Sequence, residues 1–498
     1  MRAVVVVVAL AATAVSGLRW LRVAQREHYL PGSVSTFAWR WWSLGPNAIL
    51  LLAWVLGAGL TATGRPLPGL FGAAAVGVGP FGLSVRGRTS KLAWTRRLKT
   101  LAGVWAALHL LLLGLGALIH QGTVVAVLGA GLAPVLVDAA LWLTAPVERR
   151  LAEPWVDKAK ARLNAVRPTV VAITGSYGKT STKGHLAHLV GGTKQTVPTP
   201  RSFNNRAGLA RAVNEALVPG TEVFIAEMGT YGPGEIAEMC EWCPPDVAVI
   251  TAIGPVHLER MHTEEAIAAA KAEILTKARV AVLNVDSPHL AALAERTPNA
   301  RTVSAVDRRA DVAVIDGVVY VKGERLAGVD PALAPTNVGC AVAAALELHV
   351  PPAVLAERLD GLQPAANRLT TTTAASGAAI IDDTYNSNPA GAAAALAALQ
   401  RIGTEQGKRV LVTPGMVELG VKQYDANRDL AAEASRSAAT HVVVVGHTNR
   451  RALLEGASRG TAAVIAVETR EDAVEWVKAN LAGGDTVLYE NDLPDHYP

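Results

Sequence analysis

The 498-residue sequence has few cysteines and few charged residues for its length. Its three cysteines include one close pair, Cys240 and Cys243, and no second pair completes a zinc site. We therefore interpret them as structural thiols in a reducing compartment. Charged residues make up 18% of the chain and apolar residues 50%, which excludes intrinsic disorder and favours a membrane protein. The length is too great for one ordinary core and indicates two or three domains.

Acidic side chains are almost absent from the first 150 residues. Only Glu27, Asp138 and Glu148 stand there against 14 lysines and arginines, whereas the rest of the chain holds 33 basic and 39 acidic residues. A segment of net charge +11 is thus joined to one of −6, and the overall +5 describes neither. The isoelectric point of the whole chain gives no argument for nucleic-acid binding.

Long apolar stretches fill this basic segment. A membrane-spanning helix needs about 20 mostly apolar residues, and we expect about five spans, at 3–18, 47–63, 67–85, 101–119 and 122–145. The first stretch follows Arg2, as in a signal peptide. Its cleavage site is weak and more spans follow, so we interpret it as an anchor.

Basic residues gather in two of the segments between these stretches, 19–46 and 86–100, whereas the turns at 64–66 and 120–121 carry a single arginine. The positive-inside rule places the two basic segments in the cytoplasm, and an odd number of spans then places the chain after residue 146 there too. Eight of the 11 tryptophans precede residue 150, as interfacial belts require. Nucleic-acid binding by these loops is disfavoured beside apolar spans.

Two ionisable side chains, Asp138 and His109, lie within predicted spans, where such groups are costly. They mark either a functional pocket or a plain contact with a neighbouring helix or the interface. The sequence leaves both interpretations open.

A glycine-containing loop follows an apolar segment, Thr169–Ile173, which we predict to be a buried strand. A helical pattern continues to about residue 190, and this layout directs backbone N–H groups at phosphate. Lys179 would reach the terminal phosphates and Thr180 would face Mg²⁺. The spacing departs from the usual phosphate loop, so a tight strand–helix turn is the alternative. The other candidate loop residues are Gly175, Ser176, Gly178 and Ser181.

Polar residues also follow apolar strands further along the chain. Glu227 ends one such strand and His257 lies just beyond another. Carboxyl ends of parallel strands meet at one crevice, so both side chains can face the loop, where a carboxylate and an imidazole suit a metal that bridges phosphates. Each also has a plain interpretation, as a helix cap or a loop hydrogen bonder. Lys271, in a helical stretch, can be a solvated charge.

Taken in order, these segments resemble the Mur ligase family, closest to its muramoyl-tripeptide D-alanyl-D-alanine ligase branch. The resemblance covers about 168–498. Its motifs are Thr174–Ser181, Phe203–Asn205, Glu227–Gly229, His257, the Lys271 helix, Leu283–Asp286, Thr336-Asn337, Asn367-Arg368, Asp382–Pro389 and Pro414–Gly420.

The resemblance implies an ATP-dependent ligase that makes an amide through an acyl-phosphate. ATP would phosphorylate a carboxylate, and an amine would then attack it. Lys179 and Thr180 would hold phosphate and a first Mg²⁺, with Asn205 (or Asn204) and Glu227 nearby. Two metals and a lysine fit phosphoryl transfer, which depends on positioning and charge neutralisation.

By the same resemblance His257 would bind a second Mg²⁺, and Lys271 matches the lysine that CO₂ carbamoylates. An ammonium beside Mg²⁺ would repel it, whereas a carbamate attracts it. This implies ATP, two Mg²⁺ ions and a Lys271 carbamate as cofactors.

The remaining implied contacts are on the nucleotide side and in the third domain. Asn337 resembles the adenine-side asparagine, with Asn284 as a second candidate. Arg368 and Asp383 resemble residues that close over ribose and phosphate. Closure around 364–370 would exclude water from the acyl-phosphate.

The expected fold class is therefore an α-helical transmembrane region plus α/β, with a Mur-ligase-type central phosphate-loop ATPase domain and a C-terminal Rossmann-like domain. We predict the boundaries as 1–150, 151–363 and 364–498. Strands of the third domain are expected at Ala378–Asp383, Arg409–Val412 and His441–Val445.

Two departures from the family concern the substrate. Predicted spans replace the domain that recognises a UDP-sugar peptide, and residues 488–498 are acidic where the D-alanyl-D-alanine branch is basic. An acidic segment would not hold a dipeptide carboxylate in the same way. We expect instead a lipid-linked, amphipathic or exported acid, or a peptide polymer, as in poly-γ-glutamate synthetases.

The leading hypothesis is a membrane-anchored carboxylate–amine ligase, multi-pass in a bacterial cell membrane, with its ligase domains in the cytoplasm. Its partners would be the bilayer, small-molecule or lipid-linked acids and amines, and other membrane subunits, but no nucleic acid. The alternatives are an ATPase subunit of a transporter or polymer exporter, and an inactive nucleotide-binding scaffold. Lys271 and His257 favour the enzyme, because a motor ATPase has no need of a carbamoylated lysine.

Overall fold

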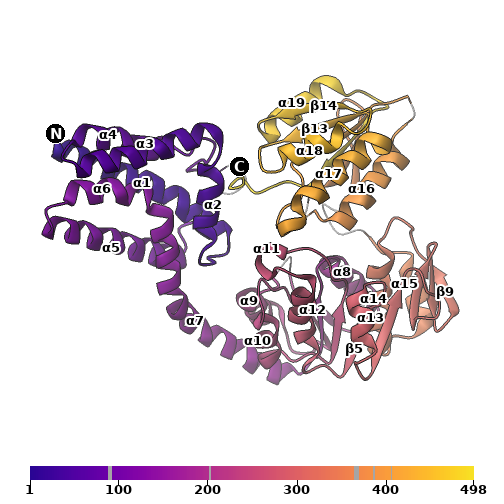
Figure 1. Ribbon diagram of the computed structural model, residues 1–498. Coiled ribbons are helices and arrows are strands. Elements are labelled where there is room, and N and C mark those ends of the chain that lie inside the picture. Colours follow the sequence, from indigo (N-terminus) through magenta and orange to yellow (C-terminus); the bar gives the residue numbers. More distant parts are fainter. Residues whose placement is uncertain (88–91, 201–202, 364–368, 385–386, 405) are drawn as a thin grey trace. The chain divides into compact units, whose positions relative to one another are not determined.

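The computed structural model describes residues 1–498 except 88–91, 201–202, 364–368, 385–386 and 405 (Figure 1). By its internal contacts the chain divides into two compact units. The first unit is Met1–Leu151 with Leu493–Pro498, and the second is Ala152–Asp492.

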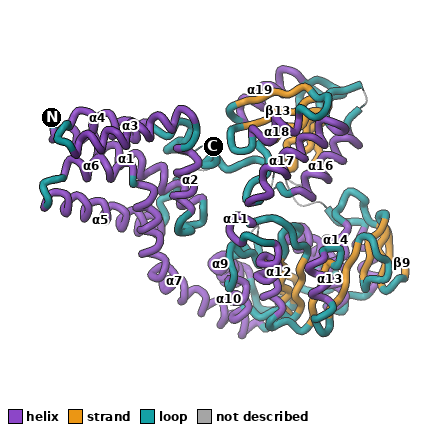
Figure 2. The backbone as a smooth tube through the Cα atoms, in the orientation of Figure 1, coloured by secondary structure: helices purple, strands orange, loops and turns teal. Residues whose placement is uncertain are grey.

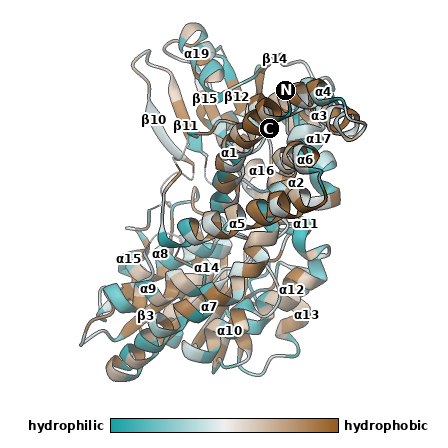
Figure 3. Ribbon diagram, turned by 90° about the vertical axis from the view of Figure 1, so that its left-hand side faces the viewer, coloured by the Kyte–Doolittle hydropathy of each residue, from teal (hydrophilic) through white to brown (hydrophobic). Residues whose placement is uncertain are grey.

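The described part of the first unit folds as helices. They are α1 (Arg2–Arg26), α2 (Ser33–Trp42), α3 (Gly45–Ala62), α4 (Pro66–Val78), α5 (Arg96–Leu118), α6 (Gly122–Gly131) and the first part of α7 (Ala133–Val166). Figure 3 shows brown, hydrophobic residues along most of them. Glycines let α3 and α4 pack closely, because a Cβ at Gly57 would lie 2.6 Å from the Pro68 carbonyl oxygen.

Among the described residues, α1, α3 and α5 are long and apolar enough to cross a membrane, and the bent α6–α7 pair raises the number to four. The structure thus offers three or four candidate spans, whereas about five were predicted from the sequence. Helix α4 has 13 residues, too few for a span of about 20. The fifth stretch bends by 78° between α6 and α7, where Pro134 cannot continue a helix from α6 because it has no backbone N–H.

Asp138 and His109 make structural contacts in this unit. The Asp138 carboxylate accepts hydrogen bonds from the backbone amides of Gly32 (2.9 Å), Val34 (3.3 Å) and Ser35 (2.7 Å), so it caps the start of α2. The ring of His109 bridges two backbone carbonyl oxygens, one on α5 and one on α6. Of the two interpretations of these residues, the structure supports the contact between helices.

In the second unit the first sheet has the strand order β2-β3-β1-β4-β5-β6-β7-β8-β9. Pairing is parallel as far as β7, and β8 and β9 add antiparallel hairpins (Figure 2). The strands are β1 (Thr169–Thr174), β2 (Thr196–Pro198), β3 (Val223–Glu227), β4 (Val247–Ile250), β5 (Val280–Asn284), β6 (Ala300–Ser304), β7 (Val312–Ile315), β8 (Val318–Val321) and β9 (Glu324–Gly328).

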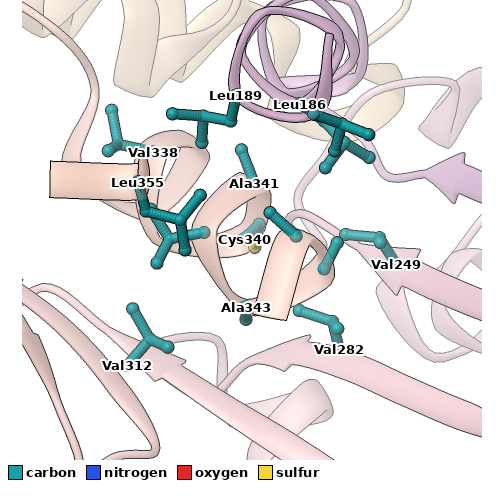
Figure 4. Packing of buried hydrophobic residues seen from close by; sticks show 14 of the residues in the cluster. Leu186, Leu189, Val249, Val282, Val312, Val338, Cys340, Ala341, Ala343 and Leu355 are labelled. Carbon is teal, nitrogen blue, oxygen red and sulfur yellow. The ribbon is translucent and has the colours of Figure 1, made fainter. Parts of the chain in front are cut away.

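Helices cover both faces of this sheet, as its buried parallel strands require. They are α8 (Lys179–Val190), α9 (Arg206–Ala216), α10 (Glu235–Trp242), α11 (Leu258–Met261), α12 (Glu264–Ala272), η1 (Glu273–Leu275), α13 (Pro288–Ala294), α14 (Pro335–Glu347) and α15 (Pro352–Leu359). Figure 4 shows the core on one face, where the alanine-rich α14 lies between Leu186 and Leu189 of α8 and Val249 and Val282 of the sheet. Small side chains on α14 allow this close packing.

The second sheet has the order β10-β11-β15-β12-β13-β14, and only β10 is antiparallel among its described strands. The strands are β10 (Thr370–Thr373), β11 (Ala379–Asp383), β12 (Arg409–Thr413), β13 (His441–Val445), β14 (Ala463–Val467) and β15 (Thr486–Glu490). Its helices are α16 (Pro389–Ile402), η2 (Gly420–Lys422), α17 (Gln423–Glu433), η3 (Ala434–Ala438), α18 (Arg450–Ala457) and α19 (Arg470–Asn480). We call this part of the second unit the third domain. The predicted fold class, an apolar helical region followed by α/β domains, is confirmed.

Replacing Asp138 by alanine tests its role as a cap. The first amides of α2 would lose their acceptor, so we expect the first unit, which we also call the helical unit, to lose about 1–2 kcal/mol of unfolding free energy. Denaturant titration of the detergent-solubilised protein, followed by tryptophan fluorescence, measures it. Asp138→Asn keeps one acceptor oxygen and should lose less. Unchanged stability in Asp138→Ala together with lost ATP turnover would instead support a functional pocket.

Candidate functional site

The loop between β1 and α8 has the geometry of a phosphate cradle. Gly178 has φ +80°, and a Cβ there would lie 2.1 Å from Asn337 Oδ1, so no other residue fits without a shift. Helix α8 begins at the next residue, Lys179, whose ammonium group donates to the Gly175 carbonyl oxygen at 2.7 Å. An anion at this helix start would meet backbone N–H groups and a lysine together.

The other loop residues differ in how deeply they are buried. Ser176 is buried, and its hydroxyl both donates to the Gly254 carbonyl and accepts from the Gly254 amide, at 3.1 Å each, so it ties the loop to the segment after β4. Thr180 and Ser181 lie in the first turn of α8 with half-buried side chains. Hence Thr180 and Ser181, unlike Ser176, are only partly buried beside the cradle.

Glu227 lies at the carboxyl end of β3 beside this loop, with 1% of its surface exposed. Its carboxylate accepts from the Thr180 hydroxyl at 3.1 Å and from Asn204 Nδ2 at 3.2 Å, and it pairs with the Lys183 ammonium group at 2.9 Å. The register of β1 and β3, in which Ile173 faces Glu227, sets this proximity. The predicted meeting of Thr180 and Glu227 is therefore present.

Two residues of this cluster differ from the sequence prediction. Asn205 caps α9 by accepting from the Gly208 amide at 2.9 Å, and Asn204 makes the contact with Glu227. Lys183 was not predicted at all. Its spacing could have identified it, because Lys183 follows Lys179 by four residues on a helix and therefore lies on the same face.

His257 starts α11 with φ +64°. Its Nδ1 contacts the Glu418 carboxylate, and the Tyr231 ring packs edge-on at 5.4 Å between centroids. Burial lowers the pKa of His257, while Glu418 acts in the opposite direction. A lowered pKa favours the neutral ring, which is the form that binds metals. Glu418 lies in the Pro414–Gly420 motif, but its contact with His257 could not be read from the sequence.

Lys271 is buried on α12, with 2% of its surface exposed. Burial lowers the pKa of its amine well below the usual range, and the charge of Lys179 lowers it further. Lys179 and Lys271 both lower the pKa of His257 as well. These three groups therefore affect one another's pKa values, and a polyanion bound nearby would offset the positive charge of the lysines.

The asparagines predicted to hold the nucleotide lie in different settings. Asn337 sits against Gly178 at the phosphate loop. Asn284, at the end of β5, donates to the Thr251 carbonyl at 2.9 Å and accepts from the Asp286 amide, so its side chain serves the fold. Arg368 lies outside the described residues.

The third domain gathers buried polar groups at the carboxyl ends of its strands. Glu490 ends β15 and accepts from the Thr413 hydroxyl at 2.7 Å and from the Ser387 hydroxyl. Burial raises its pKa to about 8, Thr413 opposes this, and the Asp383 carboxylate at the end of β11 adds to it. Residues 488–498 were predicted as one acidic segment. In the structure they divide into the end of β15, up to Glu490, a short connection, and Leu493–Pro498, which belong to the first unit.

Mg²⁺ fits these residues only together with a phosphate ligand. Among the described residues no group of three or more His, Cys, Asp or Glu side chains is arranged to hold a metal ion. The Thr180 hydroxyl and the Glu227 carboxylate supply two hard oxygen donors 3.1 Å apart. Mg²⁺ takes few protein ligands and fills its octahedron with water and phosphate oxygens. Cys240, Cys243 and Cys340 are buried thiols away from this chemistry.

Two protein-family models match the chain. The Mur ligase middle domain matches residues 173–324, and the Mur ligase glutamate ligase domain matches residues 367–489. UDP-N-acetylmuramoyl-tripeptide–D-alanyl-D-alanine ligase of Bacillus subtilis (strain 168) is 32% identical over 345 residues, which are 67% of this chain and 75% of that protein. The ligase of the same name from Mycobacterium tuberculosis (strain H37Rv) is 33% identical over 357 residues, 66% of this chain and 68% of that protein.

Solved structures agree with these matches. MurF from Acinetobacter baumannii has a TM-score of 0.59 and 25% identity, over 68% of this chain and 77% of that one. MurF from Thermotoga maritima, solved in complex with ADP, has a TM-score of 0.59 and 24% identity, over 68% of this chain and 80% of that one, and shows the fold.

Replacing Lys183 by methionine tests the ion pair with Glu227. A buried carboxylate would lose its partner, and we expect a loss of about 3–5 kcal/mol of unfolding free energy, measured by guanidinium titration. Lys183→Arg keeps the charge and should lose less. The double variant Lys183→Met with Glu227→Gln should recover most of the loss. Wild-type stability in Lys183→Met would contradict the pairing.

The raised pKa of Glu490, about 8, predicts a pH-dependent stability. A carboxyl group titrates near 4.3 in the unfolded chain, so the folded state holds the extra proton between these values. The contribution of Glu490 is complete below about pH 4.3 and is lost as the pH rises through 8. Glu490→Gln should remove this decline in urea titrations from pH 5 to 8.5. The exposed Glu433→Gln is the control, and parallel profiles for wild type and Glu490→Gln would refute the assignment.

Proposed function

The chain belongs to the Mur ligase family, and from this premise we propose that it is a membrane-anchored ligase that joins a carboxylate to an amine through an acyl-phosphate. As a family member it is an ATP-dependent, ADP-forming enzyme of the peptide-bond-forming kind. The observation that carries the proposal is the meeting of Glu227 with Thr180 beside the start of α8.

This geometry supports phosphoryl transfer. Lys179 and the first amides of α8 would bind the ATP phosphates, and Thr180 and Glu227 would hold Mg²⁺ against them. When bound there, Mg²⁺ would neutralise phosphate charge as the carboxylate oxygen of the substrate attacks the γ-phosphorus and ADP leaves. The amine then displaces phosphate from the acyl carbon. His257, as a neutral ring, would bind a second Mg²⁺, and Lys183 would remain as a charge beside the phosphates.

Carbamoylation of Lys271 is a finer part of the proposal. A buried amine of lowered pKa keeps an unshared electron pair, which attacks the carbon of CO₂ and releases a proton. The resulting carbamate would turn a group that repels metal into one that attracts it. Support comes from the burial of Lys271 and its electrostatic coupling to Lys179 and His257.

Membrane placement is supported by the outer surface of the first unit. The span candidate α5 leaves large apolar side chains unpacked, with Leu110, Leu115 and Leu118 at 68%, 51% and 76% exposure. Such a surface is unfavourable in water and suits lipid. We place the basic segments 19–46 and 86–100 and the ligase domains on the cytoplasmic side of a bacterial cell membrane.

The substrates we propose differ from the dipeptide named for the relatives. The family models begin at residue 173, and apolar helices precede them. Buried carboxyl groups, Asp383 and Glu490, line the carboxyl edge of the third domain. We infer a lipid-linked, amphipathic or exported acid, joined to an amine once or repeatedly, with the bilayer and other membrane subunits as partners.

Purification of the full chain in detergent tests this function. ADP release is followed with Mg²⁺, ATP, amino acids and cellular lipid extracts, and mass spectrometry identifies the product. We expect release only when an acid and an amine are both present. Release without either would indicate a motor ATPase, and absence of nucleotide binding would indicate a scaffold.

Lys271→Ala tests the carbamate separately. We expect ligation to fall strongly with ATP binding retained, because the metal would lose a negative ligand. Formate or acetate should restore part of the activity by occupying the vacated site. Lys277→Ala, a half-exposed lysine six residues further along, is the matched control. An unaffected Lys271→Ala enzyme would refute the carbamate role.

A further inference from the structure

The last six residues of the sequence fold with the first unit and not with the sheet that precedes them. Strand β15 ends at Glu490 in the second unit, and Leu493–Pro498 belong to the first unit. In Figure 1 the C mark lies beside α2. We call Leu493–Pro498 the anchor segment.

One buried ion pair and one buried histidine–carboxylate contact hold the anchor segment to α1 and its cap. Asp495 Oδ2 lies 2.8 Å from Arg22 Nη1, and the two side chains are 8% and 1% exposed. His496 Nε2 lies 2.7 Å from Glu27 Oε1, with similar burial of both groups. Charges removed from water this far are stable only as pairs. Release of the anchor segment would therefore leave the buried Arg22 charge without its Asp495 partner.

Aromatic contacts with α2 complete the attachment. The Phe37 ring lies 4.7 Å from the His496 ring and 4.8 Å from the Tyr497 ring, between centroids. Trp41 Nε1 donates to the His496 carbonyl oxygen at 2.8 Å. Tyr497 packs against the hydrophobic cluster of the first unit. The segment is therefore a packed part of that unit.

Helix α2 has the composition of a helix that lies at a membrane interface. Phe37 and Trp41 face the anchor segment, and Arg40 lies over the Phe37 and Tyr497 rings. Trp39, on the opposite side, is 70% exposed. An exposed tryptophan on a short amphipathic helix beside apolar helices is typical of the headgroup region. The anchor segment thus lies against the side of α2 that faces away from Trp39.

Covalent geometry transmits this attachment to the third domain. Glu490, at the carboxyl end of β15, lies five residues before the buried Asp495. The chain between them can span at most about 18 Å. The second unit is also joined to the first through the continuous helix α7. The two units are therefore connected at two points, and the second connection begins at the carboxyl edge of β15.

We propose that Leu493–Pro498 anchor the end of the third domain to α1 and α2, so that Glu490 stays within about 18 Å of chain from the attachment at Asp495. This proposal does not rest on the proposed function. The anchor limits how far the third domain can move from the helical unit during turnover. Arg22, Glu27, Phe37 and Trp41 are positioning residues for this purpose.

Distance measurements between spin labels test the anchor in the full chain. Ser43→Cys in the first unit and Ser458→Cys in the third domain provide exposed attachment sites, and the three native cysteines are buried. We expect the distance distribution to be at least twice as broad in Arg22→Ala or Asp495→Ala as in the doubly labelled chain without these changes. The exchanged pair Arg22→Asp with Asp495→Arg should narrow it again.

Two further variants separate the anchor from general damage to the fold. Trp41→Phe removes one hydrogen bond and no charge, and should broaden the distribution less. Asp492→Ala breaks the partly exposed pair with Arg470 just before the segment and should leave the width unchanged. Unchanged widths in Arg22→Ala, Asp495→Ala and Trp41→Phe would overturn the proposal. ATP turnover is not part of this readout, so failure of the ligase proposal leaves the result standing.

Discussion

The candidate site depends on one constraint, a carboxylate held out of water at the end of β3. Glu227 is satisfied by a hydroxyl and an ammonium group from α8 and by an amide from the turn at Asn204. Removal of a charge from water is unfavourable unless it is paired, so these segments must converge on Glu227. The phosphate loop, the Asn204 turn and the face of α8 that carries Lys183 are thereby fixed around one point. We infer that, when nucleotide binds, Mg²⁺ and phosphate replace some of these contacts within the network around Glu227.

The two units bury different surfaces in different ways. Parallel strands of the second unit are covered on both faces by helices and need no other partner. Helices of the first unit keep apolar side chains outward, and a bilayer would cover them. Their polar groups are used within the unit: Asp138 caps α2, and Arg22 and Glu27 receive the anchor segment. Leu493–Pro498 belong to the first unit although β15, the strand before them, belongs to the second.

Local patterns predicted the strands and the loop well, because apolar runs such as Thr169–Ile173 are bounded by glycine. Glu227 followed from the rule that carboxyl ends of parallel strands converge. Lys183 has a local signal in its spacing from Lys179. The choice of Asn204 over Asn205 and the contact of Glu418 with His257 depend on side chains brought together across long sequence separations, which no local pattern encodes. The structure has fewer span candidates than the sequence predicted, because composition does not reveal the bend before α7 or the early end of α4.

The central claim is that Glu227 and Thr180 bind a divalent ion only with nucleotide phosphate. Mn²⁺ in place of Mg²⁺ makes this measurable, because phosphorus nuclei within bonding distance couple to its electron spin. Electron–nuclear double resonance of the full chain with Mn²⁺ and ATP should show ³¹P couplings. We predict that these couplings disappear in Glu227→Ala and that Mn²⁺ without ATP does not bind. Equal couplings in Glu227→Ala, or Mn²⁺ bound without nucleotide, would contradict the account.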